Sequence, residues 1–148
     1  MKKANVLFLC TGNSCRSQMA EGWARHFYED RLTVYSAGIE AHGMNPHAVR
    51  AMQEAGVDIS KQTSKRVGAL KDVTLDLVIT VCGHADENCP ASLSAQRVVH
   101  VGFDDPPKLA KDAASEQEAH QHYCRVRDQI RDFVRDRLPQ LLADQQVG

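Results

Sequence analysis

The sequence predicts an α/β protein built on an open, four-stranded parallel sheet that is flanked by helices on both faces. Short apolar or β-branched segments alternate with segments of helical spacing, which is the pattern of successive βαβ units. Strands are expected near residues 5–9, 32–36, 75–81 and 97–101. Because crossover connections in such sheets are right-handed, few arrangements remain. We expect the strand order 2-1-3-4, with the first strand in a central position.

The strand segments have compositions that favour extended structure. Val6 to Leu9 is an uninterrupted apolar run, and residues 32–36 are β-branched and aromatic. Residues 75–81 carry the strongest buried-strand pattern in the chain, although Asp76 interrupts it. The segment 97–101 follows as a further short strand.

Three segments show helical spacing. With Ser17 as the N-cap, apolar residues recur every three or four positions as far as Phe27. A second helix is expected from Asn45-Pro46 to Gly56, because proline suits a first helical turn and glycine a helix end. The third helix runs from about 115 to 142, and Pro139 should kink or break it. Its apolar stripe consists of Tyr123, Val126, Ile130, Phe133, Val134, Leu138 and Leu141.

The composition is that of one globular domain spanning residues 1–148. Apolar residues make up 43% and charged residues 25% of the chain, which are ordinary values for a soluble protein. The net charge is −1 and the basic residues form no block, so we expect neither nucleic acid nor a membrane as partner. No apolar run has the length of a signal peptide core or a membrane span. We expect a cytoplasmic monomer whose five cysteines are reduced at rest.

A candidate nucleophile and an anion-binding loop lie between the first strand and the first helix. Five residues between a cysteine and an arginine are enough to wrap backbone N–H groups around a tetrahedral anion, and Gly12 and Asn13 can take the left-handed conformations of such a nest. Arg16 offers a planar fork to two anion oxygens. The positive end of the helix dipole favours the anion and the reactive thiolate of Cys10. The predicted oxyanion-binding residues are Thr11, Gly12, Asn13, Ser14, Cys15, Arg16 and Ser17, with Cys15 itself in a loop-packing role.

The expected sheet topology brings further candidates to the same crevice. Ligands of open parallel sheets bind beyond the carboxyl ends of the strands, beside the first strand. Cys82 and the segment 102–107 follow the third and fourth strands, so both should face Cys10. Asp105 is a candidate general acid for a poor leaving group. The alternative is that Asp104 or Asp105 only caps the turn before the prolines.

Cys82 and Cys89 indicate redox chemistry rather than simple hydrolysis. Three thiols within reach of one anion site permit attack, resolution and outward transfer of a disulfide. Two alternatives remain: Cys82, His84 and Cys89 bind zinc, although the spacing is not that of a zinc finger, or the two cysteines are buried and inert. His120, His122 and Cys124 are expected to spread around the last helix without binding a metal, with Cys124 as a packing residue.

The loop of residues 10–17, the Cys82 and Cys89 pair and the Asp104-Asp105-Pro106 motif resemble the thioredoxin-coupled arsenate reductases. These enzymes share the fold of the low-molecular-weight protein tyrosine phosphatases. The resemblance implies arsenate as substrate, with phosphate and sulfate as analogues. It also implies thioredoxin as external reductant, no bound cofactor and a role in arsenic detoxification.

The resemblance further implies a role for each site residue. Cys10 attacks arsenate held by Arg16 and the loop amides, and Asp105 protonates the departing oxygen. Cys82 then attacks Cys10, which releases arsenite. Cys89 attacks Cys82 in turn, and thioredoxin reduces the resulting disulfide.

The resemblance also implies roles for two further loop residues, and the chain differs from some members of the family at one position. Ser17 would support the Cys10 thiolate and Asn13 the loop shape. Some members bind potassium near this loop with a carboxylate where this chain has Lys65. The Lys65 ammonium can occupy that place itself, so no metal site is predicted.

Two rival functions fit part of the sequence. A low-molecular-weight phosphatase acting on a phosphoprotein or small phosphoester would use Cys10, Arg16 and Asp105 identically, and some phosphatase activity is expected in any case. However, such an enzyme leaves Cys82 and Cys89 unexplained, and it usually carries aromatic residues after the Asp-Pro pair. A thiol-based arsenite or metal sensor gives the arginine and the acid no role.

Overall fold

The computed structural model describes residues 3–83 and 95–147 and confirms the predicted parallel sheet. The strands are β1 (Ala4–Cys10), β2 (Leu32–Gly38), β3 (Leu77–Thr80) and β4 (Val98–His100). They pair in parallel in the order β2-β1-β3-β4, so the strand order expected from right-handed crossovers is confirmed. β1 lies inside the sheet, and its carboxyl end at Cys10 therefore has a strand on each side.

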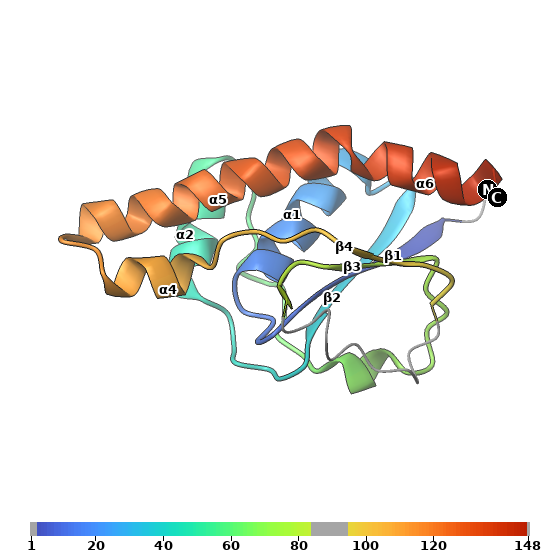
Figure 1. Ribbon diagram of the computed structural model, residues 1–148, viewed down its shortest axis with the longest axis horizontal. Coiled ribbons are helices and arrows are strands. Elements are labelled where there is room, and N and C mark those ends of the chain that lie inside the picture. The colour runs from blue at the N-terminus through green and yellow to red at the C-terminus, as the bar shows by residue number, and fades with distance from the viewer. Residues whose placement is uncertain (1–2, 84–94, 148) are drawn as a thin grey trace.

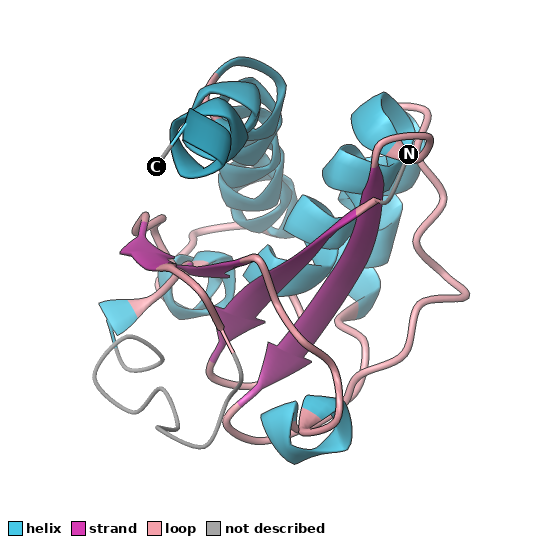
Figure 2. Cartoon of the chain, turned by 90° about the vertical axis from the view of Figure 1, so that its right-hand side faces the viewer, coloured by secondary structure: helices cyan, strands magenta, loops and turns pink. Residues whose placement is uncertain are grey.

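Helices cover the sheet on both faces, as Figures 1 and 2 show. The described helices are α1 (Arg16–Tyr28), α2 (Pro46–Glu54), the 3-10 helix η1 (Val67–Leu70), α4 (Pro106–Lys111), α5 (Glu116–Asp136) and α6 (Leu138–Val147). α1 and α5 pack against each other on one side of the sheet, and η1 lies on the other side. α2 and α4 both pack against α5.

The apolar stripes predicted for α1 and for the last helix form the core. All seven residues predicted for the stripe of α5 and α6 are buried, and Ile130 is fully buried. On α1, Trp23 is buried and its indole Nε1 donates a hydrogen bond to Arg127 O at 3.2 Å. Burial of such side chains stabilises the fold by about 1.5–3 kcal/mol each. The packing fixes α1, and with it the loop that precedes α1, against the sheet.

The ends of the helices follow the expected local chemistry at α2 and depart from it at α1. Asn45 caps α2, because its Oδ1 accepts hydrogen bonds from His47 N at 2.8 Å and Ala48 N at 3.3 Å. Gly56 follows the helix with φ of 87°, as a terminating glycine should. At α1 the N-cap is Cys15 and not Ser17, because the Ser17 hydroxyl is turned into the protein.

Two further differences from the sequence prediction concern the last third of the chain. α4 begins at Pro106, within the segment 102–107 that was expected to be a loop, and it continues to Lys111. The long helix expected over 115–142 is divided at Arg137 into α5 and α6, close to Pro139. Proline cannot supply the N–H that a continuous helix would need, so the break lies where the sequence indicated it.

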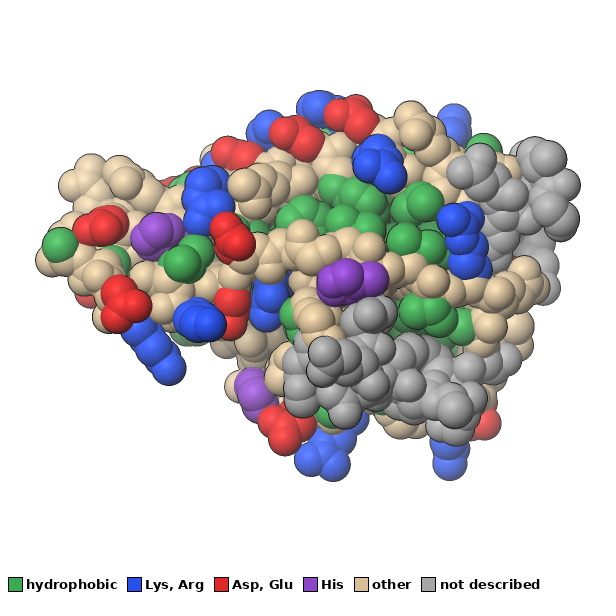
Figure 3. Space-filling model, viewed as in Figure 1, with side chains coloured by type: hydrophobic (Ala, Val, Ile, Leu, Met, Phe, Trp, Pro, Cys, Tyr) green, Lys and Arg blue, Asp and Glu red, His purple; other side chains and the backbone are tan. Residues whose placement is uncertain are grey.

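The exposed side of α5 carries charges of both signs (Figure 3). Neighbouring pairs include Arg131 Nη2 with Asp132 Oδ1 at 3.0 Å and Arg135 Nε with Asp136 Oδ1 at 2.9 Å. These basic residues of α5 therefore each lie beside an acidic one. Within residues 3–83 and 95–147, none of the helices combines the length and the apolar content that a membrane span requires.

Candidate active site

The anion loop, residues 10–17, joins the carboxyl end of β1 to the first turn of α1 and is held by the segment 39–45. Backbone hydrogen bonds run along it from Ile39 N to Cys10 O (3.1 Å), Glu40 N to Thr11 O (2.8 Å), His42 N to Gly12 O (2.8 Å) and Asn45 N to Ser14 O (3.0 Å). The C=O and N–H of one trans peptide point in opposite directions. The N–H groups of the same four peptides therefore point away from segment 39–45, which is the orientation that a backbone anion nest needs.

Gly12 and Asn13 meet different requirements in this loop. Asn13 has φ of 49°, so the left-handed conformation expected for it is confirmed. Gly12 has no positive φ, and the same expectation is wrong there. The ring of His42 occupies the space in which a side chain at position 12 would start. Glycine is needed at that position for close approach rather than for backbone freedom.

A chain of buried hydrogen bonds runs from the carboxylate of Glu21 to the sulfur of Cys10. Asn13 Nδ2 donates to Ser17 Oγ at 2.9 Å and to Ser36 Oγ at 3.0 Å. Ser36 Oγ donates to Glu21 Oε1 at 2.6 Å, and Ser17 Oγ lies 2.8 Å from Cys10 Sγ. Because the amide nitrogen only donates, each hydroxyl keeps its hydrogen for its second partner. Ser17 can therefore donate to the Cys10 thiolate, and such charge-assisted bonds stabilise the ionised sulfur.

The two cysteines of the anion loop differ in their surroundings. Cys15 is buried in the core cluster, and this burial raises the pKa of its thiol, while the guanidinium of Arg16 opposes the rise. Cys15 therefore remains a protonated thiol at neutral pH, in keeping with the packing role expected for it. Cys10 has the Ser17 hydroxyl beside its sulfur, so it is the better nucleophile of the two.

Arg16 connects the anion loop to the loop that carries Asp105. Its Nη1 donates to Phe103 O at 3.0 Å, and its Nη2 lies 3.7 Å from Asp105 Oδ1. Asp105 is the N-cap residue of α4, but its side chain makes no capping hydrogen bond. Asp104 points elsewhere and pairs with Arg125 at 3.1 Å. The Asp105 carboxyl group is thus available to act on an anion beside Arg16. Neither aspartate side chain caps α4 with a hydrogen bond.

Cys82 lies beside the anion loop. β3 neighbours β1 with Thr80 opposite Leu9, and Cys82 follows just beyond the end of β3. Its sulfur is 3.2 Å from Thr11 Oγ1, one residue from the nucleophile, and the side chain is buried. The structure therefore brings together Cys10, Arg16, Asp105 and Cys82. Cys89, the third thiol of the expected relay, lies outside the described residues, as does His84.

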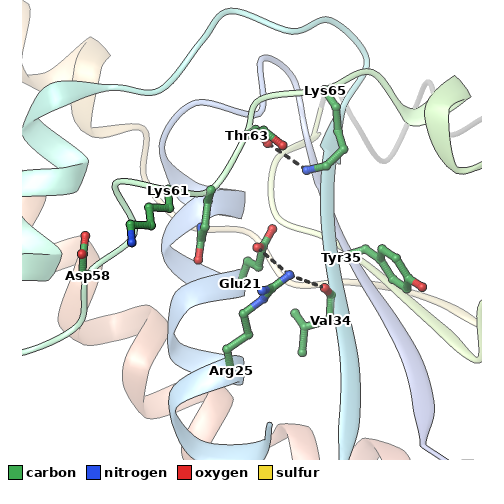
Figure 4. Close-up of a pocket in the computed structure, with 9 residues that line it drawn as sticks. Glu21, Arg25, Val34, Tyr35, Asp58, Lys61, Thr63 and Lys65 are labelled. Carbon is green, nitrogen blue, oxygen red and sulfur yellow. Dashed lines mark hydrogen bonds and ion pairs between the residues drawn. The ribbon is translucent and has the colours of Figure 1, made fainter.

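A cavity of about 300 Å³ lies between α1, β2 and the segment 58–65, and Lys65 and Glu21 are among the side chains that line it (Figure 4). Lys65 Nζ donates to Ser36 O and to Thr63 O, both at 2.8 Å. Burial lowers the pKa of Lys65, and the negative charge of Glu21 opposes this. The Lys65 side chain contacts two backbone carbonyl oxygens beside this cavity.

Sequence reasoning missed Gln18, which supports the anion loop from below. Its side chain is fully buried, and its Nε2 donates to Asn13 O at 3.0 Å and Thr63 O at 3.1 Å. Its Oε1 accepts a hydrogen bond from Gln62 Nε2 at 2.9 Å. The available signal was a polar residue directly before the apolar stripe of α1. Helical spacing alone does not show what such a residue contacts.

The sequence is similar to those of known proteins. Residues 5–147 match the family described as low molecular weight phosphotyrosine protein phosphatase. The chain is 54% identical over 130 residues to an arsenate reductase of Halalkalibacterium halodurans, and the match covers 88% of this chain and 91% of that protein. It is 51% identical over 130 residues to an arsenate reductase of Bacillus subtilis, with the same coverage of 88% and 91%.

Solved structures agree with these sequence matches. An arsenate reductase in a phosphate binding state has a TM-score of 0.74 and 31% identity, and the match covers 90% of this chain and 95% of that one. An arsenate reductase in an oxidized state has a TM-score of 0.73 and 32% identity, with 88% and 92% covered. The YwlE arginine phosphatase has the same fold, with a TM-score of 0.67 at 22% identity and coverage of 97% and 99%.

Replacement of Ser17 tests the hydrogen bond to the nucleophile. Ser17→Ala should slow alkylation of Cys10 by iodoacetamide at neutral pH about tenfold, because a hydrogen bond to a charged group contributes about 1.5–3 kcal/mol. The rate is followed by mass spectrometry of the Cys10 peptide. Ser64→Ala is the matched control, since the Ser64 hydroxyl contacts Gly12 O at 3.3 Å but not the sulfur. Equal rates for Ser17→Ala and the unaltered protein would contradict the assignment.

Proposed function

The chain belongs to the low molecular weight phosphotyrosine protein phosphatase family, and we propose that it reduces arsenate to arsenite with thioredoxin as electron donor. The observation that carries the proposal is the second thiol beside the anion loop, with Cys82 Sγ 3.2 Å from Thr11 Oγ1. Hydrolysis of a phosphoester needs one cysteine, an arginine and an acid. A two-electron reduction needs a further thiol that reaches the first. The arsenate reductases at about half identity support the same assignment.

In the first step the anion loop binds arsenate as it would bind any tetrahedral oxyanion. The loop amides and the Arg16 guanidinium hold its oxygens, and the Cys10 thiolate attacks arsenic. One As–O bond breaks as the S–As bond forms, and Asp105 gives its proton to the departing oxygen, which leaves as water. The distance of 3.7 Å between Arg16 Nη2 and Asp105 Oδ1 supports this role, because an acid beside the guanidinium is near any anion that Arg16 binds.

The next steps move two electrons from sulfur to arsenic. The Cys82 thiolate attacks Cys10 Sγ, a disulfide forms, and the electron pair of the S–As bond stays on arsenic, which leaves as arsenite. Cys89 then attacks Cys82 and sets the Cys10 thiolate free. The dithiol of thioredoxin reduces the Cys82–Cys89 disulfide, so each arsenate consumes one reduced thioredoxin.

Single cysteine variants test the relay. Thioredoxin-linked arsenate turnover should be abolished in Cys10→Ser, Cys82→Ser and Cys89→Ser, because each variant lacks one of the three transfers. Turnover is measured as oxidation of NADPH through thioredoxin reductase and thioredoxin. Cys124→Ser is the control for loss of a thiol elsewhere, and it should turn over arsenate like the unaltered protein.

The same variants separate reduction from hydrolysis. Cys82→Ser should keep hydrolysis of an aryl phosphate, since that reaction uses only Cys10, Arg16 and Asp105. Full arsenate turnover in Cys89→Ser would contradict the three-thiol relay. A protein that hydrolyses phosphoesters but never reduces arsenate would be a phosphatase, the rival function within the family.

Asp105→Asn should reduce kcat for arsenate about 10²- to 10⁴-fold, because general acid catalysis contributes that much to departure of a poor leaving group. The loss should be smaller for an aryl phosphate whose phenolate leaves without a proton. Asp104→Asn is the matched control, because its carboxylate pairs with Arg125 on the surface. Equal losses in both variants would show that Asp105 acts only through the structure of its loop.

Lys65 is proposed to replace a bound cation. Its ammonium contacts two carbonyl oxygens, Ser36 O and Thr63 O, that would otherwise be free to coordinate a metal. The unaltered protein should therefore have the same Tm in potassium and in sodium at equal ionic strength. Lys65→Asp should become stabilised by saturating potassium by about 1–3 kcal/mol. The control Lys61→Asp, in the same cavity, should not. Potassium-dependent stabilisation of the unaltered protein would count against the proposal.

A further inference from the structure

A second group of chemically reactive side chains lies between α2 and α5, outside the anion loop. Glu54 is the last residue of α2, and it meets His120 and Cys124, which are one helical turn apart on α5. α2 and α5 lie side by side in Figure 1 and pack against each other. The sequence prediction that His120, His122 and Cys124 diverge is wrong for His120 and Cys124. These two share one face of the helix, and the third group comes from α2.

The ligand atoms of these three residues lie close to the spacing of a tetrahedral zinc site. His120 Nε2 is 3.4 Å from Cys124 Sγ, and Cys124 Sγ is 3.9 Å from Glu54 Oε1. Zinc bonds of about 2.0 Å to nitrogen or oxygen and about 2.3 Å to sulfur put ligand atoms about 3.3–3.6 Å apart. The remaining pair, Glu54 Oε1 and His120 Nε2, is 2.5 Å apart. It needs to open by about 0.8 Å when an ion replaces the shared proton.

The orientation and exposure of the group suit an ion that enters from solvent. His120 Nδ1 is buried and has no hydrogen-bond partner in the described part of the chain, so the polar contacts of the imidazole lie on its Nε2 side. The side chain of Glu54 is 47% exposed, which leaves a path for the ion and for a water ligand. Thiolate, imidazole and carboxylate together form a donor set that suits zinc. Magnesium and calcium sites instead use oxygen ligands alone.

Two guanidinium groups lie next to the three residues. Arg50 Nε lies 3.8 Å from the second oxygen of Glu54, Oε2, and leaves Oε1 to face His120. Arg127 Nη1 lies 3.6 Å from Cys124 Sγ, and the charge of Arg127 is paired with Asp128 at 2.8 Å. The thiolate and carboxylate together supply two negative charges, which match the charge of a zinc ion.

We propose that Glu54, His120 and Cys124 form a zinc-binding site that links α2 to α5, with water as the fourth ligand. Binding displaces the proton between Glu54 and His120 and the thiol proton of Cys124 into solvent. The site holds three protein ligands rather than four, so its affinity should lie below that of closed structural zinc sites. It does not depend on the reaction proposed for the anion loop.

Cobalt titration of the full chain tests the site. One equivalent of Co²⁺ should produce the near-ultraviolet thiolate band and the visible bands of a four-coordinate ion, and Zn²⁺ should displace it. Zinc should also raise Tm. The bands should be lost in Cys124→Ser and weakened in Glu54→Gln, whose side chain is 47% exposed in the unaltered protein. His122→Ala, two residues from each α5 ligand, is the matched control and should bind normally.

A second variant tests whether Cys82 or Cys89 supplies the thiolate that binds cobalt. The double variant Cys82→Ser/Cys89→Ser should keep the cobalt bands, and circular dichroism should show that Cys124→Ser is folded. Bands that persist in Cys124→Ser and in Glu54→Gln, or that vanish in the double variant, would overturn the proposal. So would the absence of cobalt binding to the unaltered protein, since the three residues would then form only a hydrogen-bonded contact between helices.

Discussion

The buried side chain of Asn13 is the constraint on which the candidate active site depends. Its amide nitrogen contacts Ser17 and Ser36, its oxygen accepts from Lys65 N at 2.8 Å, and its own backbone is left-handed. A buried amide left without partners costs about 1–3 kcal/mol, so the loop, the first turn of α1 and the segment at residue 65 are held in one arrangement. The same contacts position the Ser17 hydroxyl against Cys10.

Arg16 connects this rigid loop to the rest of the chemistry. The guanidinium is aligned for an anion, yet it also binds Phe103 O and approaches Asp105. The position of the proposed acid therefore depends on the residue proposed to hold the substrate, and we expect a change at Arg16 to disturb both functions. A planar group with five fixed donors can make all these contacts at once, which lysine at this position could not.

The proposal of reduction rather than hydrolysis rests on the arrangement of the sheet. β1 and β3 are neighbours and run parallel, so the residues after their carboxyl ends meet at one edge. That arrangement brings Cys82 against Thr11, which lies 71 residues earlier in the chain. Without the second thiol, the anion loop and Asp105 would describe a phosphatase. Parallel pairing thus puts a second thiol beside the anion loop, which is the feature that the proposed thiol exchange requires.

The sequence by itself determined the strand order, the apolar stripes of α1 and α5, and the anion loop. The strand order rests on the right-handedness of crossover connections. The stripes and the loop rest on periodicity and short-range spacing, which a single segment displays without its neighbours. Only the tertiary structure decided that Gln18 supports Asn13, that Asp105 is free of capping, and that Glu54 meets His120. The local sequence pattern around each of these side chains does not predict its partner. The proximity of His120 and Cys124, by contrast, follows from their i, i+4 spacing on α5, which the sequence prediction overlooked.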